Sequence, residues 1–288
     1  MRIEVQTFTV HKRFPLTISR GTTAQTTNVW LRVEHAGIEG WGEASPFSVG
    51  ELPQTTEGIV QALQQVAPLL ATLSPLDRQQ IELKLQELQL PSAARTAIEI
   101  ALQDWLGKRA GLPLWQLWGL DRSRVLPTSV TIGINPPEVA RQRVRDWLQL
   151  TEVKAFKVKL GLPDGFLADQ EFLRAVLAEI PPATQVLVDA NGAWTVEVAI
   201  KMCEWLAELG VIYVEQPLPR GQEAGLVELY GRSPLPIFVD ESCFTSQDIV
   251  RLADRVHGIN IKLMKSGGLA EALRMIHTAR ACGLQVML

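Results

Sequence analysis

The sequence predicts an α/β protein, a (β/α) barrel preceded by an N-terminal α+β domain. From about residue 124 the chain alternates strictly between short apolar strands and amphipathic helices, and this alternation is typical of parallel strand–helix units. Before that point three strands precede three helices, and such segregation indicates an α+β module. We therefore expect two domains, residues 1–123 and residues 124–288.

The N-terminal domain shows strand-like runs first and helical periodicity afterwards. Its strands are expected at 3–10, 27–34 and 38–43, and its helices at 56–73, 75–88 and 92–110. A short turn at 35–37 joins the second and third strands. Ser92 is a suitable N-cap for the third helix, and Gly111 follows the end of that helix. Residues 118–123 are expected to connect the two domains.

Five successive strands of the second domain end on charged or amide residues. These strands are expected at 155–159, 186–191, 212–216, 237–241 and 259–262. The spacings from Lys159 to Asp189, Glu215, Asp240 and Lys262 are 30, 26, 25 and 22 residues, about one strand–helix unit each. Right-handed crossovers place the C-terminal ends of parallel strands on one side. We therefore expect these five side chains to converge at one mouth of the barrel.

The elements before and after these strands bring the number of barrel strands to seven. A strand at 128–134 leads to a helix at 136–150, and a helix at 269–281 ends at Gly283 before a strand at 284–288. A complete barrel has eight strands, so we expect this domain to be incomplete at its C-terminal end. A doubly wound sheet is the alternative, but its active residues usually cluster at one crevice rather than across five strand ends.

The bulk composition excludes several classes of protein. The net charge is −3, and no basic stripe suggests nucleic acid or a membrane surface as a partner. No apolar run is long enough to span a bilayer, and the N-terminus lacks a secretory apolar region. The three cysteines match neither a zinc site nor a disulfide framework. We expect a cytoplasmic protein that acts on a small molecule, and we leave a homo-oligomer open.

Three carboxylates at successive strand ends, Asp189, Glu215 and Asp240, predict a divalent metal site. Mg²⁺ prefers hard oxygen ligands in octahedral geometry. Without a cation, three neighbouring carboxylates would raise each other's pKa. Any one of them alone could be an ordinary cap of the following helix. Three in succession, flanked by lysines, favour one Mg²⁺ ion.

The lysines supply candidate acid–base groups. Lys157 and Lys159 lie two apart on one strand, so their side chains project to the same face. Two close ammonium groups disfavour each other's charge, so we expect the pKa of one of them to fall and to give a usable base. Lys262 lies four strands later, on the opposite wall of an eight-stranded barrel. A proton can then leave one face of a carbon and return to the other.

These groups together predict a site that abstracts the proton next to a carboxylate. Removal of that proton gives an enediolate with two adjacent anionic oxygens. A divalent ion on those oxygens stabilises the charge as it develops. A small-molecule carboxylate is therefore the expected substrate.

Five motifs occur together at the strand ends. They are Lys157-Val158-Lys159, Asp189-Ala190-Asn191, Glu215-Gln216-Pro217, Asp240-Glu241-Ser242 and the stretch 260–268. As a set, and over nearly the whole chain, they resemble the muconate-lactonizing subgroup of the enolase superfamily. The resemblance implies a barrel of the enolase type with a capping domain, and one Mg²⁺ held by Asp189, Glu215 and Asp240. It also implies that Lys159 and Lys262 are the paired acid–base residues.

Within this subgroup the chain is most similar to the L-Ala-D/L-Glu (dipeptide) epimerases. The similarity lies in the stretches 18–22, 40–46 and 259–268. It implies an isomerase that abstracts and returns the α-proton of a dipeptide such as L-Ala-L-Glu. These epimerases hold the substrate ammonium with an Asp-x-Asp pair after the eighth strand, and this sequence ends before that strand.

The same resemblance implies roles for residues around the lysines and the metal. Lys157 would tune the acid–base lysine beside it and touch the substrate carboxylate. Asn191 and Glu241 would support the metal ligands from behind. Arg20 is a candidate for binding a distal carboxylate of the substrate, and Thr131, near the end of the first barrel strand, is a candidate for lining the site.

Two alternatives stay open. The same site could serve an o-succinylbenzoate synthase, an N-acylamino acid racemase or a muconate cycloisomerase. Outside enzymology, the chain could be a truncated, inactive barrel that only binds or scaffolds. The presence of both acid–base lysines favours transfer of one proton between the two faces of a carbon.

Overall fold

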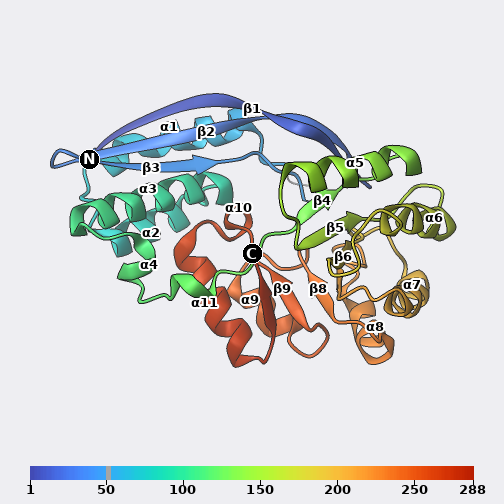
Figure 1. Cartoon of the computed structure of the whole chain (residues 1–288). Helices are drawn as coiled ribbons and strands as arrows, with labels where there is room; N and C mark the ends of the chain where they lie inside the picture. The colour runs from blue at the N-terminus through green and yellow to red at the C-terminus, as the bar shows by residue number, and fades with distance from the viewer. Residues whose placement is uncertain (50–52) are drawn as a thin grey trace. The chain divides into compact units, whose positions relative to one another are not determined.

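The structure is a computed structural model that describes residues 1–49 and 53–288, and the chain divides into two compact units (Figure 1). The first unit contains residues 1–11, 25–125 and 261–276, and the second contains residues 12–24, 126–260 and 277–288. The boundary between the two longest segments of these units falls at Val125–Leu126, and the N-terminal domain was expected to end at residue 123. Residues 12–24 group with the second unit and residues 261–276 with the first.

The N-terminal strands form a three-stranded sheet in the order β1-β2-β3. The strands are β1 (Arg2–Ile18), β2 (Gly21–His35) and β3 (Ile38–Ala44). β2 and β3 pair antiparallel, from Val29 opposite Ala44 to His35 opposite Ile38. The two residues between these strands, Ala36 and Gly37, both have positive φ, 51° and 75°. This is the backbone that a tight two-residue hairpin requires, and the predicted turn at 35–37 is confirmed.

Helices of the first unit follow the sheet, as the sequence predicts. They are α1 (Thr56–Ala71), α2 (Arg78–Glu87), α3 (Ser92–Ala110) and the short α4 (Leu114–Leu117), followed by a 3-10 turn, η1 (Arg122–Arg124). Figure 1 shows α3 lying along β3. A Cβ atom at Gly40 or Gly42 would overlap the carbonyl oxygen of Ala101 or Ala97, so the glycines permit this close approach.

The boundaries of α3 correct one prediction and confirm another. The helix ends at Gly111, whose φ of 68° gives the expected left-handed stop. Ser92, expected to cap the helix, is instead its first residue, and Pro91 occupies the cap position. The Ser92 hydroxyl donates a hydrogen bond of 2.6 Å to the carbonyl oxygen of Met264. The Ser92 side chain, which the N-cap preference for serine assigned to the helix start, therefore binds a residue distant in the sequence instead.

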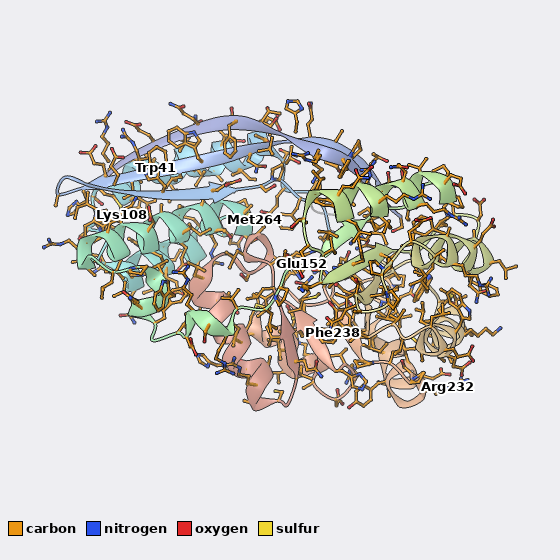
Figure 2. The ribbon with its side chains drawn as sticks, in the orientation of Figure 1. Trp41, Lys108, Glu152, Arg232, Phe238 and Met264 are labelled. Atoms are coloured by element: carbon orange, nitrogen blue, oxygen red, sulfur yellow. The ribbon has the colours of Figure 1, made fainter. Side chains whose placement is uncertain are left out.

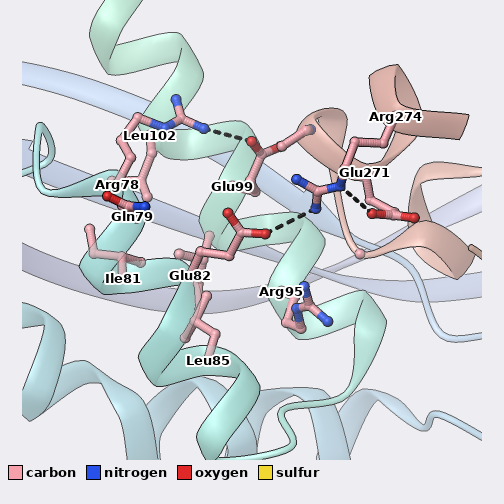
Figure 3. Close-up of a pocket in the computed structure, with 13 residues that line it drawn as sticks. Arg78, Gln79, Ile81, Glu82, Leu85, Arg95, Glu99, Leu102, Glu271 and Arg274 are labelled. Atoms are coloured by element: carbon pink, nitrogen blue, oxygen red, sulfur yellow. Dashed lines mark hydrogen bonds and ion pairs between the residues drawn. The ribbon is translucent and has the colours of Figure 1, made fainter. Parts of the chain in front are cut away.

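Charged side chains near α2, α3 and the start of α11 (Leu269–Ala281) line a cavity of about 210 Å³ in the first unit (Figure 3). Arg78 lies 2.7 Å from Glu99. Arg274 pairs with Glu82 at 2.9 Å and with Glu271 at 2.6 Å. Arginines and glutamates alternate around this cavity, so the residues that line it carry little net charge.

The second unit contains a seven-stranded parallel sheet in the order β10-β9-β8-β7-β6-β5-β4. The strands are β4 (Val130–Ile132), β5 (Ala155–Lys159), β6 (Gln185–Asp189), β7 (Val214–Glu215), β8 (Ile237–Val239), β9 (Gly258–Asn260) and β10 (Gln285–Met287). Each strand pairs with the next one in sequence, which is the order of a (β/α) barrel. In a doubly wound sheet the order of the strands would reverse partway across the sheet. The predicted barrel architecture is therefore confirmed.

Helices connect these strands, and Figure 1 shows α5 to α8 on the outer side of the curved sheet. The helices are α5 (Pro137–Leu150), α6 (Phe166–Leu177), α7 (Val196–Glu208), α8 (Leu226–Arg232), α9 (Ser246–Leu252) and the short α10 (Leu263–Ser266), with a 3-10 turn, η2 (Glu223–Gly225), before α8. The strands are nearly continuous apolar runs because both faces of a parallel sheet are covered. Across residues 1–49 and 53–288, no helix combines the length and the apolar character that crossing a membrane requires.

Candidate active site

The C-terminal ends of β5, β6 and β7 bring two lysines and two carboxylates together. Lys159 and Asp189 are register partners in the β5–β6 pair. The Lys159 Nζ atom lies 2.6 Å from Asp189 Oδ2. The Lys157 Nζ atom lies 2.9 Å from the same oxygen and 2.5 Å from Glu215 Oε2. Asp189 and Glu215 are fully buried, and both lysines point to one face, as their two-residue spacing predicts.

Burial and charge shift the pKa values of this cluster in opposite directions. Burial alone would lower the pKa of Lys157, but the carboxylates of Asp189 and Glu215 raise it above its ordinary value. Burial would raise the pKa of Asp189, yet Lys157 and Lys159 hold it well below its usual range. Burial and the negative charge of Asp189 raise the pKa of Glu215 to about 7. The expected fall of a lysine pKa does not occur at Lys157, because the carboxylates outweigh the neighbouring ammonium.

Asp240 follows β8 and is placed by the side chain of Gln216. The Gln216 Oε1 atom accepts hydrogen bonds from the backbone N–H of Asp240 at 2.9 Å and of Ser242 at 3.2 Å. Gln216 has a φ of 38°, in the left-handed region that a residue other than glycine rarely adopts. The charge of Asp240 contributes to the raised pKa of Glu215, which places the third predicted carboxylate close to the others.

Arg20, Asn191 and Glu241 form a second group in the same unit. Arg20 donates to Glu241 Oε1 at 2.8 Å and to the carbonyl oxygen of Asn191 at 3.1 Å. The Asn191 side chain donates to the same Glu241 oxygen at 3.2 Å, and the Asn191 backbone N–H donates to Asp189 Oδ1 at 2.9 Å. Asn191 thus links Glu241 to Asp189, and the support of a metal ligand by Asn191 and Glu241 stays a prediction. The Arg20 guanidinium is engaged with Glu241, and its predicted contact with a substrate carboxylate stays a prediction.

Thr131 lies on β4 directly opposite Lys157 in the parallel register. Register partners on neighbouring strands project to the same face of the sheet. The half-buried Thr131 side chain is therefore next to the lysine face, and its contact with a substrate stays a prediction.

Lys262 belongs to the first unit, two residues beyond the end of β9 and directly before α10. The strand is shorter than predicted, so Lys262 lies beyond its end, as the extended N-cap residue of the single helical turn α10. Two α3 side chains hold that turn: Thr96 donates to the carbonyl oxygen of Leu263 and Ser92 to that of Met264, both at 2.6 Å. The predicted place of Lys262, opposite Lys159, stays a prediction.

A third α3 side chain holds the residues that follow this turn. The Glu99 carboxylate accepts hydrogen bonds from the backbone N–H groups of Leu269 and Ala270, at the start of α11. A Cβ atom at Gly268 would collide with the Glu99 side chain. Ser92, Thr96 and Glu99 are spaced at four and three residues, so they share one face of α3.

The three predicted ligands are carboxylates, the hard oxygen donors that Mg²⁺ prefers. Among residues 1–49 and 53–288, no three histidine, cysteine, aspartate or glutamate side chains stand ready to hold a metal ion. The Lys157 ammonium lies between Asp189 and Glu215, so a cation already bridges two of the three predicted ligands. Burial and the negative charges of Asp189 and Asp240 raise the pKa of Glu215, although the Lys157 ammonium opposes them. A divalent ion would compensate that charge, and the assignment of the three ligands stays a prediction.

Sequence reasoning placed two polar residues in the site motifs but gave them no role in shaping the site. Asn260, on β9, donates a hydrogen bond of 2.8 Å from Nδ2 to Glu215 Oε1. A polar residue between Ile259 and Ile261 in a buried strand is a signal that could have identified it. Gln216 carries no comparable signal, because its role depends on a positive φ and on a contact with the next strand end.

Comparisons with known proteins place these features in one group. Residues 2–119 match the mandelate racemase/muconate lactonizing enzyme N-terminal domain, and residues 139–288 match the enolase C-terminal domain-like family. The chain is 44% identical to the hydrophobic dipeptide epimerase of Flavobacteria bacterium (strain MS024-2A), covering all of this chain and 82% of that protein. It is 34% identical to the L-Ala-D/L-Glu epimerase of Bacteroides thetaiotaomicron, covering 96% of this chain and 70% of that protein.

Solved structures agree with these matches. The dipeptide epimerase of Enterococcus faecalis V583, complexed with Mg and the dipeptide L-Leu-L-Tyr, superposes with a TM-score of 0.92 at 30% identity. The alignment covers 99% of this chain and 80% of that protein.

Proposed function

This chain belongs to the enolase superfamily, with the N- and C-terminal domains of the mandelate racemase/muconate lactonizing enzyme group, and from that premise we propose that it is a Mg²⁺-dependent dipeptide epimerase. Epimerases that act on dipeptides match the chain over its whole length at 42–44% identity. The enzyme is an isomerase: it removes the α-proton of one residue of the substrate and returns it to the opposite face. Its cytoplasmic location and the absence of nucleic-acid partners belong to the same proposal.

The placement of Lys159 is the observation that supports this proposal most. Its Nζ atom lies 2.6 Å from a buried carboxylate at the mouth of a parallel barrel sheet. Asp189 fixes the direction of the amine, and Lys157 adds a positive charge beside it. A positioned amine next to a site for an anionic substrate is the arrangement that general-base abstraction of a weakly acidic proton requires.

We assign one Mg²⁺ ion to Asp189, Glu215 and Asp240. When bound, Mg²⁺ would supply positive charge to the substrate carboxylate, which makes the neighbouring C–H bond more acidic. In this chain, Asn260 orients Glu215 through Nδ2, and Gln216 fixes the backbone of Asp240.

Lys159 and Lys262 divide the proton transfer between them in this proposal. Lys159 takes or gives the proton on one face of the α-carbon, and Lys262 does so on the other. The α3 side chains Ser92 and Thr96 hold the turn that carries Lys262. Lys157 binds the substrate carboxylate, and its ammonium balances the charge there.

The names of the relatives support a finer proposal for the substrate class. The two relatives at 42–44% identity are called hydrophobic dipeptide epimerases, whereas two called L-Ala-D/L-Glu epimerases are each 34% identical. We therefore propose a dipeptide with an apolar C-terminal residue ahead of the expected L-Ala-L-Glu. The engaged Arg20 guanidinium agrees with this order, because Glu241 already neutralises it.

Incubation of the purified protein with Mg²⁺ and a dipeptide panel in deuterated water tests the proposed activity. Deuterium entering the α-position of the C-terminal residue, together with inversion at that carbon, is the expected result. The rates with Leu-Tyr and with Ala-Glu show which of the two substrate classes the enzyme prefers. Turnover of a cyclohexadiene acid or a muconate without exchange into any dipeptide would replace the epimerase with the alternative reactions.

Thermal unfolding with and without Mg²⁺ tests the metal site separately. Mg²⁺ at 100 times its dissociation constant should stabilise the protein by about 2.7 kcal/mol. Asp240→Asn should remove this stabilisation, while Asp254→Asn, at an exposed residue paired with Arg255, should retain it. An equal response of both variants to Mg²⁺ would contradict the assigned ligand.

A further inference from the structure

Asp169 is a buried carboxylate outside the group of residues that face the substrate. It lies in the first turn of α6 and is 1% exposed. Its Oδ1 atom accepts hydrogen bonds of 2.9 Å from the backbone N–H groups of both Gly161 and Leu162. Its Oδ2 atom accepts a hydrogen bond of 3.1 Å from Trp194 Nε1. Each carboxylate oxygen therefore serves a different segment of the chain.

The two segments are the loops that follow the catalytic strands β5 and β6. Gly161 and Leu162 come directly after Lys159 and Leu160, and Trp194 comes three residues after Asn191. One carboxylate thus joins the loop after the proposed base to the loop after the proposed metal ligand. Such a link constrains how far the ends of β5 and β6 can separate.

Close packing between these loops supports the same reading. The Leu160 backbone N–H donates to the carbonyl oxygen of Asp189 at 2.9 Å. Gly161 has a φ of 93°, and a Cβ atom there would collide with Ala193 in the neighbouring loop. The two loops therefore touch at a position where only glycine fits, and Asp169 lies immediately behind that contact.

The chemistry of Asp169 indicates that this residue holds the two loops in position rather than only stabilising the fold. Among residues 1–49 and 53–288, Asp169 forms no ion pair, and its hydrogen-bond donors are three neutral N–H groups. A buried carboxylate without a counter-ion is expensive to desolvate. Its three donors come from two directions, and this geometry fixes the loops in a way that an apolar side chain would not.

We propose that Asp169 is a positioning residue for the proton transfer: by joining the loops after β5 and β6 it holds the Lys159 amine at its working position beside Asp189. The proposal rests on the proposed epimerase activity. Asp169 itself touches neither of these side chains and acts only through the two loops.

The two-lysine reaction makes this role distinguishable from a general structural role. Loosening the β5 and β6 loops displaces Lys159 but leaves the turn that carries Lys262 held by α3. Proton exchange from the epimer that Lys159 serves should therefore slow, while exchange from the other epimer continues. A displacement of about 1 Å can cost on the order of 100-fold in rate.

Two matched variants test the proposal. Asp169→Asn replaces one acceptor with an NH₂ group, and Trp194→Phe removes the indole donor and leaves a smaller aromatic ring. Lys159→Ala first identifies the epimer that Lys159 serves, because exchange from that epimer stops. We expect both variants to slow exchange from that epimer by roughly 10- to 100-fold, with KM and the exchange of the other epimer nearly unchanged. Equal slowing of both epimers, or a change confined to KM, would overturn the proposal.

Amide hydrogen exchange supplies a readout that does not depend on turnover. We expect the Gly161 and Leu162 amides to exchange at least about tenfold faster in Asp169→Asn than in the wild type. Unchanged protection of these amides would overturn the link between the loops, even if the protein proves to act on another substrate. Absence of dipeptide exchange in the wild type would instead contradict the proposed function. Trp194→Phe serves as the milder variant if Asp169→Asn folds poorly.

Discussion

Lys159 is the residue on which the proposed reaction depends most directly. Its amine is held 2.6 Å from Asp189 Oδ2 at the end of β5, whereas Lys157 on the same strand lies between Asp189 and Glu215. Lys159→Ala should reduce epimerisation by about 10²- to 10⁴-fold, the range for loss of a general base. The rate of inversion of a dipeptide, followed by polarimetry, measures this loss. Lys154→Ala, at an exposed residue paired with Glu152, is the control and should keep full activity.

Gln216 makes a prediction about stability at the same scale. Its Nε2 group donates to the carbonyl oxygen of Leu218 at 2.8 Å and to Ser242 Oγ at 2.9 Å. Gln216→Glu would place a carboxylate oxygen against that buried carbonyl and should cost roughly 1–3 kcal/mol. Urea denaturation measures the loss. The exposed Gln222→Glu should change stability by less than about 0.5 kcal/mol, and an equal effect of both variants would refute the role of the Gln216 side chain.

Residue-scale prediction from sequence works where a strand fixes the direction of a side chain. The alternation along β5, with the rule that parallel strands end on the same side, was enough to predict that Lys157, Lys159 and Asp189 converge. The same logic failed for the pKa of Lys157, because sequence spacing shows the neighbouring ammonium but not the two carboxylates that surround it. Asp169 could not be predicted, because its partners are two backbone N–H groups and the Trp194 indole, all in loops whose shape depends on tertiary contacts.

At the scale of elements, the contact of β3 with α3 makes the sharpest prediction. Gly42→Ala would push a Cβ atom into the carbonyl oxygen of Ala97, and overpacking of this kind should cost about 1–3 kcal/mol. Gly58→Ala is the matched control, because a Cβ atom at this helical position meets only Thr55 Oγ1, at 3.4 Å. The control should stabilise the protein by about 0.5–1 kcal/mol. The two melting temperatures should therefore move in opposite directions, and movement in the same direction would contradict the close packing.

The boundaries of elements were predictable to very different degrees. α3 and α11 match their predicted residues, because each is followed by a glycine in the left-handed conformation that marks the end of the helix. β7, β8 and β9 are shorter than predicted. The polar residues that follow them, such as Asp240, bond to side chains and loops rather than to the next strand. β1 is longer than predicted, since a polar strand in a hairpin shows little hydrophobic alternation.

At the scale of the whole molecule, the lowered pKa of His257 leads us to expect that the free energy of unfolding decreases in acid. Its Nδ1 atom accepts a hydrogen bond of 3.1 Å from the backbone of Ile237, and burial lowers its pKa from the ordinary 6.5. The unfolded chain therefore binds more protons just below pH 6.5, so stability is retained above that pH and falls as the pH drops. His257→Asn keeps an acceptor but cannot titrate. Urea denaturation between pH 5 and pH 8 should show a shallower acid loss for this variant, and identical profiles would contradict the prediction.

The architecture of the whole chain was predictable because it repeats. Strand–helix alternation specifies a sequential parallel sheet, and the order from β4 to β10 follows it. The grouping of residues 12–24 and 261–276 was not predictable, since it depends on contacts between distant parts of the chain. Local pattern shows which elements form, whereas only tertiary contacts decide the unit to which a connecting segment belongs.

The stripe of Ser92, Thr96 and Glu99 on α3 has a consequence for engineering. The turn that carries Lys262 takes its shape from hydroxyl and carboxylate groups more than 160 residues earlier in the chain. If residues 262–270 were replaced by those of a relative with another specificity, the new segment would lack the α3 side chains that hold its backbone in that relative. Exchanging residues 262–270 together with Ser92, Thr96 and Glu99 should preserve the orientation of the lysine.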